Sequence, residues 1–521
     1  MMTSRRTFLR QIGGLAGSLA FFPANHRALA DATSALPRST AAAAGVDAAG
    51  IHAFLDALAE KRMELHSFML LRHGQVAAEG WWAPYGPEFR HTLYSLSKSF
   101  TSTAIGMLVA DGKLSVEEKV ASFFPEDLPA GDGGRLAEVR VKDLLTMSVG
   151  HAKDPTSEMV KSENWLRTFL AWPVEHAPGT RFVYNSGATY ALSAIVQKRS
   201  GKTLLEFLRG RLFEPLGIGN ATWETCPRGI CTGGWGLSVP TEALAKFGEL
   251  YLRKGQWNGR EVLPAAWIAE ATAKQIQQPG NNEKSDWQQG YGYQFWRCRH
   301  GAFRGDGAFG QYIVAMPEQD AVFVATAEVS NMQAELDLVW EHLLPALKPA
   351  TLPDDPAAEK RLRERLAGLS LTPPAGIANP GGARINGKTA RFEKNALGIE
   401  SVEFAMQDVN CAFTFRDGDG SHRVVAGFGA WSRGEFALAG TPPRLVSGGA
   451  PKSGTLHPVS ASAAWTDANT LTLMLRFHET PHHDRFVFRF DGDKVGLAFT
   501  GSIVALNAGK DSRPQLTSTL G

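Results

Sequence analysis

The chain has 521 residues, of which 44% are hydrophobic and 20% are charged, and its net charge is +2. This composition is that of a globular protein and excludes a disordered or fibrous chain. A nearly neutral chain also lacks the basic surface of a nucleic-acid-binding protein. The length favours more than one domain, because single cores stop growing at about 250–300 residues.

Residues 1–30 are predicted to be a twin-arginine signal peptide. Residues 4–10 read Ser-Arg-Arg-Thr-Phe-Leu-Arg, an apolar stretch runs from Ile12 to Phe22, and Ala28-Leu29-Ala30 offers a cleavage site. The alternative is an amphipathic start to a cytosolic protein. With the signal, we expect a periplasmic or secreted protein with no membrane span after cleavage, because no later apolar run is long enough.

The elements predicted for residues 31–347 are typical of one antiparallel sheet covered by helices, an α+β fold. Apolar residues at helical spacing predict a helix over 46–62. Two strands follow over 67–72 and 75–82, and a buried helix after Ser95 ends near Gly112. The remaining expectations are helices over 141–147, 164–170, 188–200, 204–212, 240–253 and 265–274, strands over 292–298, 310–316 and 321–327, and a last helix over 335–344 stopped by Pro345.

The composition and the pattern of predicted elements change after residue 347. Residues 348–356 are rich in proline, and a charged helix is predicted over 357–367, so 348–370 is interpreted as a linker and helix. Short alternating segments separated by Asp-Gly turns follow, which predicts a smaller all-β accessory domain over 371–521. The sequence does not indicate what this domain does, nor the oligomeric state.

Ser95 and Lys98 form a candidate nucleophile and base. A serine hydroxyl needs a base within hydrogen-bond reach. If Ser95 begins the buried helix, Lys98 lies one turn further on the same face. A lysine in an apolar pocket has a lowered pKa and can accept a proton. Taken alone, a Ser-x-x-Lys pair is most often an ordinary pair on a helix surface.

Five segments in order raise the specificity of this interpretation. They are 94–100 (Tyr-Ser-Leu-Ser-Lys-Ser-Phe), 141–150 (Val-Lys-Asp-Leu-Leu-Thr-Met-Ser-Val-Gly), 182–187 (Phe-Val-Tyr-Asn-Ser-Gly), 233–238 (Gly-Gly-Trp-Gly-Leu-Ser) and 305–311 (Gly-Asp-Gly-Ala-Phe-Gly-Gln). With these segments, residues from about 45 to 347 resemble the superfamily of class C β-lactamases and penicillin-binding proteins. The likeness is greatest to its branch of esterases and 6-aminohexanoate-dimer hydrolases.

The resemblance implies a role for each motif residue. Ser95 would be the nucleophile, Lys98 its activating partner, and Tyr184 the general base and then acid. The backbone N–H groups of Ser95 and Ala308 would form the oxyanion hole. The implied fold is an antiparallel sheet flanked by an all-helical region. No metal and no organic cofactor are implied, and the substrate would be a small ester, amide or peptide.

Two motif positions depart from the family pattern. Ser186 stands where the Tyr-x-Asn motif has asparagine, which keeps a donor and an acceptor on a shorter side chain. Gly305-Asp306-Gly307 stands where β-lactamases have Lys-Thr-Gly, so the cation that helps to hold a β-lactam carboxylate is missing. Arg304 is adjacent and could substitute if the register slips. The candidates for substrate contact are Ser186, Gly305, Asp306, Gly307 and Ala308.

Two further groups of residues, cysteines and histidines, each allow a structural and a functional interpretation. Cys226 and Cys231 could close a small loop by a disulfide in an oxidising compartment, or remain free buried thiols. His478, His482 and His483 could bind a metal, but Pro481 argues against one helical face, and solvated loop histidines are the favoured interpretation. We therefore expect no metal site.

The sequence as a whole predicts an exported serine hydrolase that cleaves an ester or amide through an acyl-enzyme on Ser95. The alternatives are a D-alanyl-D-alanine carboxypeptidase or peptidase, a β-lactamase, and a non-catalytic cell-wall-binding sensor that uses the same cleft. The missing lysine weighs against the β-lactamase, and the intact Ser95, Lys98 and Tyr184 weigh against the sensor.

Overall fold

The computed structural model describes residues 35–521, except 132–133, 379, 447–453 and 507–508. The signal peptide predicted for residues 1–30 lies outside the described residues and stays a prediction. Within the described part of the chain, no helix is both long and apolar enough to cross a membrane.

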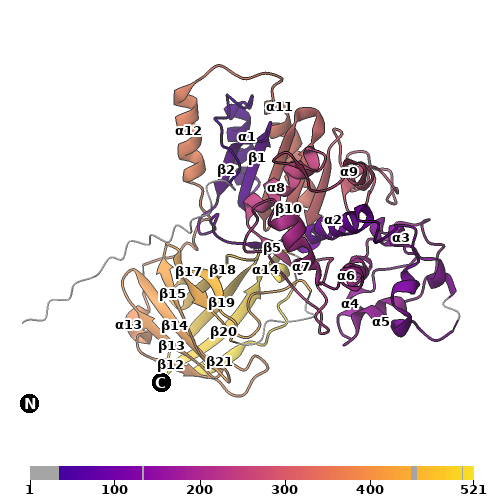
Figure 1. Ribbon diagram of the computed structural model, residues 1–521. Coiled ribbons are helices and arrows are strands. Elements are labelled where there is room, and N and C mark those ends of the chain that lie inside the picture. The colour runs from indigo at the N-terminus through magenta and orange to yellow at the C-terminus, as the bar shows by residue number, and fades with distance from the viewer. Residues whose placement is uncertain (1–34, 132–133, 379, 447–453, 507–508) are drawn as a thin grey trace, which may run out of the picture. The chain divides into compact units, whose positions relative to one another are not determined.

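A six-stranded antiparallel sheet forms the centre of the N-terminal region, which we define as residues 36–347 (Figure 1). Its order is β2-β1-β11-β10-β9-β8, so β2 lies at the edge beside β1, and β1 pairs on its other side with β11, more than 200 residues later in the chain. The strands are β1 (Leu65–Arg72), β2 (Gln75–Trp81), β8 (Trp296–Arg297), β9 (Phe303–Gly307), β10 (Gln311–Met316) and β11 (Ala321–Ala327). The interior strand β1 is buried along its whole length, because helices cover both faces of the sheet.

The two faces of the sheet pack against different helices. On one face, Phe54 of α1 (Ala48–Glu60) packs edge-on against Phe68 and Phe323. The other face packs against α8 (Thr241–Leu252), where a Cβ added to Gly248 would lie 2.6 Å from Val322. Alternate residues of β11 thus belong to two hydrophobic cores, one on each side of the sheet.

The helix that closes the N-terminal region extends past Pro345. It consists of α10 (Met332–Leu338), a π-helical turn (Val339–Leu343) and α11 (Leu344–Ala346). The expectation that Pro345 stops the helix is wrong. Pro345 is followed by one more helical residue, Ala346, so the helix ends two residues beyond the predicted Leu344.

Helices make up most of the chain between β2 and β8 (Figure 1). The α-helices are α2 (Ser97–Ala110), α3 (Val141–Leu145), α4 (Thr156–Met159), α5 (Trp165–Leu170), α6 (Ser186–Ser200), α7 (Leu204–Leu208), α8 and α9 (Ala265–Thr272). Short 3-10 helices are η1 (Tyr94–Leu96), η2 (Val120–Phe123), η3 (Pro125–Asp127) and η4 (Gly134–Glu138), and a π-helical turn covers Arg209–Phe213. A small three-stranded sheet and a strand pair also belong to this region. The sheet has the order β3 (His91–Thr92), β5 (Leu237–Val239), β4 (Thr222–Trp223), and the pair is β6 (Gln256–Trp257) with β7 (Arg260–Glu261).

Two strand expectations need correction. Of the strand predicted over 292–298, only Trp296–Arg297 is formed. The next strand, β9, was not predicted as a strand from its pattern. Three of its residues, Gly305, Asp306 and Gly307, are of types that are depleted in strands, and its burial on both faces removes the alternation.

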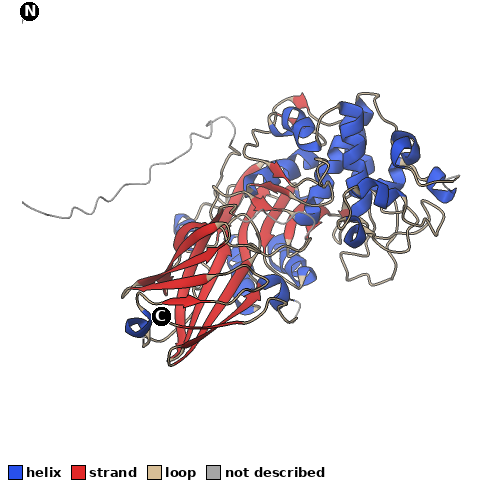
Figure 2. Cartoon of the chain, turned by 90° about the horizontal axis from the view of Figure 1, so that it is seen from below, coloured by secondary structure: helices blue, strands red, loops and turns tan. Residues whose placement is uncertain are grey.

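The C-terminal region, which we define as residues 371–521, is in its described residues an all-β structure with two short helices (Figures 1 and 2). Its strands are β12 (Thr389–Arg391), β13 (Ser401–Met406), β14 (Asn410–Asp417), β15 (Gly420–Phe428), β16 (Ser432–Phe436), β17 (His457–Asp467), β18 (Thr470–Phe477), β19 (His483–Asp491), β20 (Lys494–Gly501) and β21 (Leu516–Thr519). The helices are α13 (Gly382–Ile385) and α14 (Ser502–Leu506), and α12 (Pro356–Ala367) precedes the region.

The C-terminal sheet closes into a barrel-like structure. The first and last strands meet where Thr389 and Gly521 exchange two backbone hydrogen bonds of 3.0 Å. Closure removes the unpaired edges that an open sheet would present. Aromatic rings fill the interior, with Phe404, Phe413 and Phe488 in mutual contact. The interior is therefore a packed core.

Candidate active site

Ser95 lies in the 3-10 turn that leads into α2, and Lys98 lies in the first turn of that helix. The Lys98 ammonium donates to Ser95 Oγ at 2.9 Å, to Ser186 Oγ at 3.0 Å and to the Gly234 carbonyl at 2.8 Å. Ser95 and Ser186 are half-buried, whereas Lys98 is 1% exposed. The predicted pair is thus in contact, with the serine at the surface and the lysine beneath it.

The surroundings of Lys98 favour its neutral form. Burial lowers the Lys98 pKa to about 7, and the nearby carboxylates of Asp154 and Asp306 oppose this shift only in part. A neutral amine has a lone pair that can accept the Ser95 proton, which an ammonium does not have. Close to neutral pH, Lys98 can therefore act as the base for Ser95.

Tyr184 completes the predicted trio. Ser95 lies close enough to act on the pKa of its hydroxyl, and the Lys98 Nζ lies 4.7 Å from the centre of its ring. The ring stacks on Trp296 with 5.6 Å between centroids. Burial and the charge of Asp306 raise the pKa of Tyr184, so this side chain stays a phenol near neutral pH. The arrangement suits Tyr184 to donate a proton, and Lys98 to accept the first one.

Ser186 takes the place of the expected asparagine without losing the contact to Lys98. It is the first residue of α6, whose N-cap is Asn185. The backbone N–H of Ser186 donates to Asp154 Oδ2 at 3.1 Å, while its Oγ accepts from Lys98. The serine hydroxyl therefore bridges the lysine to the start of a buried helix.

Asp154 is a site residue that the sequence analysis missed. It is half-buried, and its charge acts on both Lys98 and Tyr184. Its other oxygen accepts from the N–H and the hydroxyl of Thr156, at 3.0 and 2.6 Å. The Asp-Pro-Thr sequence signals this local turn. Its closeness to Lys98 depends on tertiary packing.

The predicted glycines let strand β9 approach the Ser95 turn very closely. A Cβ added to Gly307 would lie 2.0 Å from the Leu93 carbonyl oxygen. A Cβ added to Gly305 would lie 2.5 Å from Leu96 Cδ1, within the same turn as Ser95. Ala308, the next residue after β9, is half-buried. The structure thus places the two predicted oxyanion donors on adjacent segments.

Arg304 and Asp306 lie on the other face of β9 and pair with each other. Arg304 is fully buried, and its guanidinium lies 2.9 Å from Asp306 Oδ2. The same guanidinium donates to the Asp286 carbonyl at 2.7 Å and lies over the rings of Trp287 and Trp296. Arg304 therefore does not replace the missing cation. Burial raises the pKa of Asp306 and Arg304 partly offsets this, so Asp306 acts on the site by charge from beneath.

Cys226 and Cys231 are free buried thiols in the structure. They lie in a tight hairpin in which the N–H of Cys226 donates to the Ile230 carbonyl at 2.8 Å. The sequence left open whether these two cysteines form a disulfide or stay free, and in the structure both are free thiols.

The interpretation of His478, His482 and His483 as solvated loop residues is wrong. His478 and His482 are 1% and 0% exposed, and His483 is half-buried. The loop between β18 and β19 packs against the N-terminal region, where the His478 ring lies 4.2 Å from that of Phe89. The local sequence resembles an exposed turn, and only contacts with distant residues bury it.

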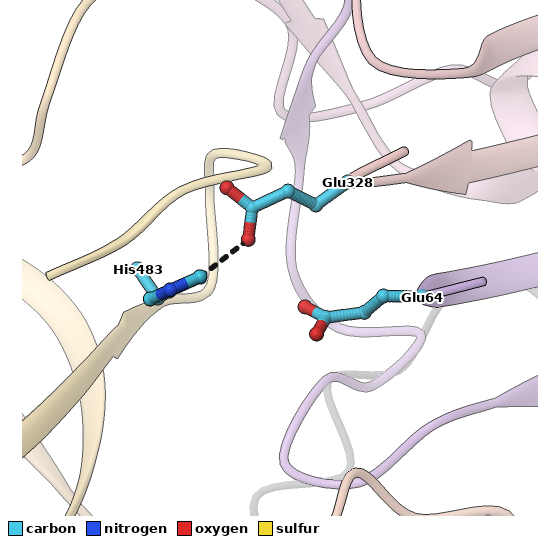
Figure 3. A group of neighbouring side chains, drawn as sticks. All are labelled: Glu64, Glu328 and His483. Atoms are coloured by element: carbon cyan, nitrogen blue, oxygen red, sulfur yellow. Dashed lines mark hydrogen bonds and ion pairs between the residues drawn. The ribbon is translucent and has the colours of Figure 1, made fainter. Parts of the chain in front are cut away.

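Glu64, Glu328 and His483 converge where the two regions meet (Figure 3). Each offers a possible metal ligand atom, and these atoms lie within 4.8 Å of one another. However, both oxygens of Glu64 accept from Arg476, and those of Glu328 lie 3.3 Å from His482 and 2.6 Å from His483. Since each carboxylate oxygen already has a partner, this cluster is an ion-pair network between the regions.

A family model described as Beta-lactamase matches residues 51–346. The chain belongs to the beta-lactamase family. The match covers Ser95, Lys98, Asp154, Tyr184, Ser186 and residues 304–308, and the predicted fold class, a β-lactamase-like α+β region followed by a smaller all-β region, is confirmed. This is a family of serine hydrolases whose members similar to this chain include an esterase and amide hydrolases.

Three relatives and one solved structure show what this beta-lactamase family member is similar to. The 6-aminohexanoate-dimer hydrolase of Paenarthrobacter ureafaciens is 28% identical over 302 residues, which cover 52% of this chain and 76% of that protein. The lovastatin esterase of Penicillium rubens is 30% identical over 150 residues, covering 24% and 37%. The beta-lactamase of Escherichia coli K12 is 28% identical over 145 residues, covering 27% and 37%. The octameric penicillin-binding protein homologue from Pyrococcus abyssi covers 90% of this chain and 99% of its own, at 18% identity and a TM-score of 0.48.

Proposed function

We propose that this protein is an exported serine hydrolase that cleaves an ester or amide through an acyl-enzyme on Ser95. The observation that carries the proposal is the contact of 2.9 Å between Ser95 Oγ and Lys98 Nζ, together with the burial that lowers the Lys98 pKa to about 7. A nucleophile requires such a base within hydrogen-bond reach and in its neutral form.

In the first step, Ser95 Oγ attacks the substrate carbonyl carbon and its proton passes to Lys98. The carbon–oxygen double bond opens to an oxyanion. Collapse of this intermediate expels the alcohol or amine, which takes a proton from the Tyr184 hydroxyl; that hydroxyl regains a proton from Lys98. Water then repeats the sequence against the acyl-enzyme, releases the acid and restores Ser95.

The oxyanion would be held by the backbone N–H groups of Ser95 and Ala308. Fixed donors of this kind contribute most where charge develops in the transition state. The close approach of β9 to the Ser95 turn, which requires Gly305 and Gly307, supports this assignment. No described cation other than Lys98 needs to enter the step.

The charges around Ser95 favour a substrate without a carboxylate next to the scissile bond. β-Lactams and D-alanyl-D-alanine peptides both carry such a carboxylate, which needs a cation. At the corresponding position this chain has Gly305, Arg304 is buried against Asp306, and Asp154 adds a negative charge. A neutral ester or amide fits better, in keeping with the esterase and dimer hydrolase among the relatives.

The proposal is tested by comparing ester turnover of the wild type with that of Ser95→Ala and Lys98→Met. We expect each variant to lose on the order of 10³-fold or more in kcat/KM for p-nitrophenyl esters, and only the wild type to gain the mass of a fluorophosphonate adduct. Full turnover by Ser95→Ala would refute the assignment. Turnover of nitrocefin, or of a D-alanyl-D-alanine peptide, faster than of the ester would identify the β-lactamase or carboxypeptidase instead. A wild type that reacts with none of these probes would indicate the sensor.

Export is proposed from residues 1–30 alone. Its test is cell fractionation of the full chain and of the double variant Arg5→Lys, Arg6→Lys. We expect the wild type outside the cytoplasm and the variant to accumulate inside as the uncleaved form. Equal distribution of both forms would contradict the twin-arginine signal.

A further inference from the structure

The C-terminal region contacts the segment that carries Ser95 through one buried histidine. His482, in the loop between β18 and β19, is 0% exposed. Its Nε2 lies 2.5 Å from the hydroxyl of Tyr94, the residue directly before Ser95, although 388 residues separate the two in the chain. The neighbour of the candidate nucleophile is therefore held by the far end of the protein.

The direction of this hydrogen bond follows from the groups around His482. Its Nδ1 lies 3.3 Å from Oε1 of Glu328 and 2.9 Å from the Ser502 hydroxyl. Burial alone would raise the pKa of Glu328, but the hydrogen bonds and charges of His482 and His483 outweigh it and lower the pKa below its usual value. Glu328 is therefore an ionised carboxylate, which can only accept hydrogen bonds. The His482 proton thus lies on Nδ1, and Nε2 accepts from the Tyr94 hydroxyl.

His482 also contacts Phe309, which directly follows Ala308. The three rings of Tyr94, Phe309 and His482 form a triangle, with centroid distances of 5.6 Å (Tyr94–Phe309), 5.0 Å (Phe309–His482) and 5.8 Å (Tyr94–His482). The two edge-on contacts to His482 connect the turn before α2, which holds Tyr94, with the segment after β9, which holds Phe309. One histidine thus touches the neighbours of both proposed oxyanion donors.

Tyr94 and Phe309 both have left-handed backbone conformations, with φ angles of 47° and 69°. Bulky residues rarely adopt this conformation, which is strained and persists only where the surroundings hold it. These two residues set the course of the backbone next to the N–H groups of Ser95 and Ala308. Whatever holds the two rings therefore also holds the direction of those donors.

We propose that His482 is a positioning residue of the active site: by holding Tyr94 and Phe309, it fixes the N–H groups of Ser95 and Ala308 that bind the oxyanion. This inference rests on the proposed function, because it assumes that oxyanion hole. It gives the C-terminal region a specific part in the acylation step, beyond that of an accessory domain.

The test uses the full chain with Tyr94→Phe, which removes only the hydroxyl, and His482→Leu, which removes the acceptor. We expect each to lower kcat for a p-nitrophenyl ester by about tenfold or more, with a change in KM of less than about threefold, because misplaced donors act on the transition state. The double variant should be no slower than the slower single one. His482→Gln, whose amide oxygen can accept from Tyr94, should recover part of the loss.

A matched control is His422→Leu, which removes another buried histidine of the C-terminal region, 2.9 Å from Asp417. It should lower the melting temperature and leave kcat unchanged. If Tyr94→Phe and His482→Leu keep the wild-type kcat while Ser95→Ala is inactive, the positioning role is wrong and the proposed function stands. Single effects that multiply in the double variant would also overturn it. Should His482→Leu fail to fold, Tyr94→Phe alone decides the question.

Discussion

Lys98 is the residue whose protonation should set the pH dependence of the enzyme. Burial lowers its pKa to about 7, and the amine must be neutral to accept the Ser95 proton. We therefore expect kcat/KM for a neutral ester to fall as the pH drops through about 7, and to level off above it. A pH profile with a neutral substrate checks this. A flat profile between pH 6 and 8 would contradict Lys98 as the base.

Asp154 should influence the pH at which kcat/KM falls. Its negative charge raises the Lys98 pKa, against the larger opposite effect of burial. In Asp154→Asn the charge is gone, but an amide oxygen can still accept from the Ser186 N–H. The Lys98 pKa should fall further, so we expect the acidic limb of the profile to move to lower pH.

The control for this prediction is Asp467→Asn. Asp467 is a turn residue of the C-terminal region whose carboxylate accepts from the Asn469 N–H at 2.8 Å. It should leave the pH profile in place. A shift of Asp154→Asn to higher pH would show that Asp154 does not act on Lys98 through its charge.

At the scale of elements, the approach of β9 to the Ser95 turn should be intolerant of a single methyl group. In Gly307→Ala the new Cβ would lie 2.0 Å from the backbone oxygen of Leu93, so strand and turn must move apart. We expect kcat/KM to fall by on the order of 10²-fold and stability to fall by about 1–3 kcal/mol. Ester kinetics and thermal denaturation measure the two effects.

The matched control is Gly434→Ala, in strand β16. Among the described residues, none has a heavy atom within 4 Å of the added Cβ, and Gly434 has no positive φ angle. We expect wild-type kinetics and a melting temperature that is unchanged or slightly higher. Equal losses in both variants would mean that β9 has no special closeness to the site.

The elements could be predicted where one local pattern decides them. Helix α6 begins at Ser186, two residues before the predicted start, because the Asn185 side chain caps it. Strand β9 could not be predicted, since its glycines serve the approach to another segment and not its own strand propensity. The spacing of Ser95 and Lys98 predicted their contact, and the resemblance to the family placed Tyr184 beside them.

The remaining features depend on contacts across the whole chain. Asp154 could not be identified as a site residue, because its relation to Lys98 is tertiary. The same holds for His482, whose partners Tyr94 and Glu328 lie 388 and 154 residues away. The local sequence, two histidines after a proline, does not indicate these distant partners. The predicted domain boundaries near 347 and 371 stay predictions.

At the scale of the whole molecule, the ion pair between the half-buried Glu64 and the buried Arg476 should dominate the coupling of the two regions. Burial alone would raise the pKa of Glu64, but Arg476 and His66 lower it to about 2. Arg476→Met leaves Glu64 without its cation, and we expect a loss of about 3–5 kcal/mol in unfolding free energy at pH 7. Because Glu64 in the wild type loses its stabilising charge as the pH falls from 4.5 toward 2, the difference should shrink in acid.

Denaturant titration measures this loss, with two controls. Glu64→Gln combined with Arg476→Met should be less unstable than Arg476→Met alone, because no unpaired charge is then buried. Arg433→Met removes an exposed ion pair with Glu88 that joins the same two regions, and should cost at most about 1 kcal/mol. If the two single arginine variants were equally unstable, burial would not be the reason for the strength of the Arg476 pair.

In evolutionary terms, the contact between Tyr94 and His482 ties together two stretches of one gene that the family model separates, since that model ends at residue 346. Recombination that exchanged the β region for that of another lineage would place a foreign side chain against the residue before the nucleophile. Homologous chains should therefore inherit these two positions as a pair, with phenylalanine at position 94 wherever the imidazole at position 482 has been lost.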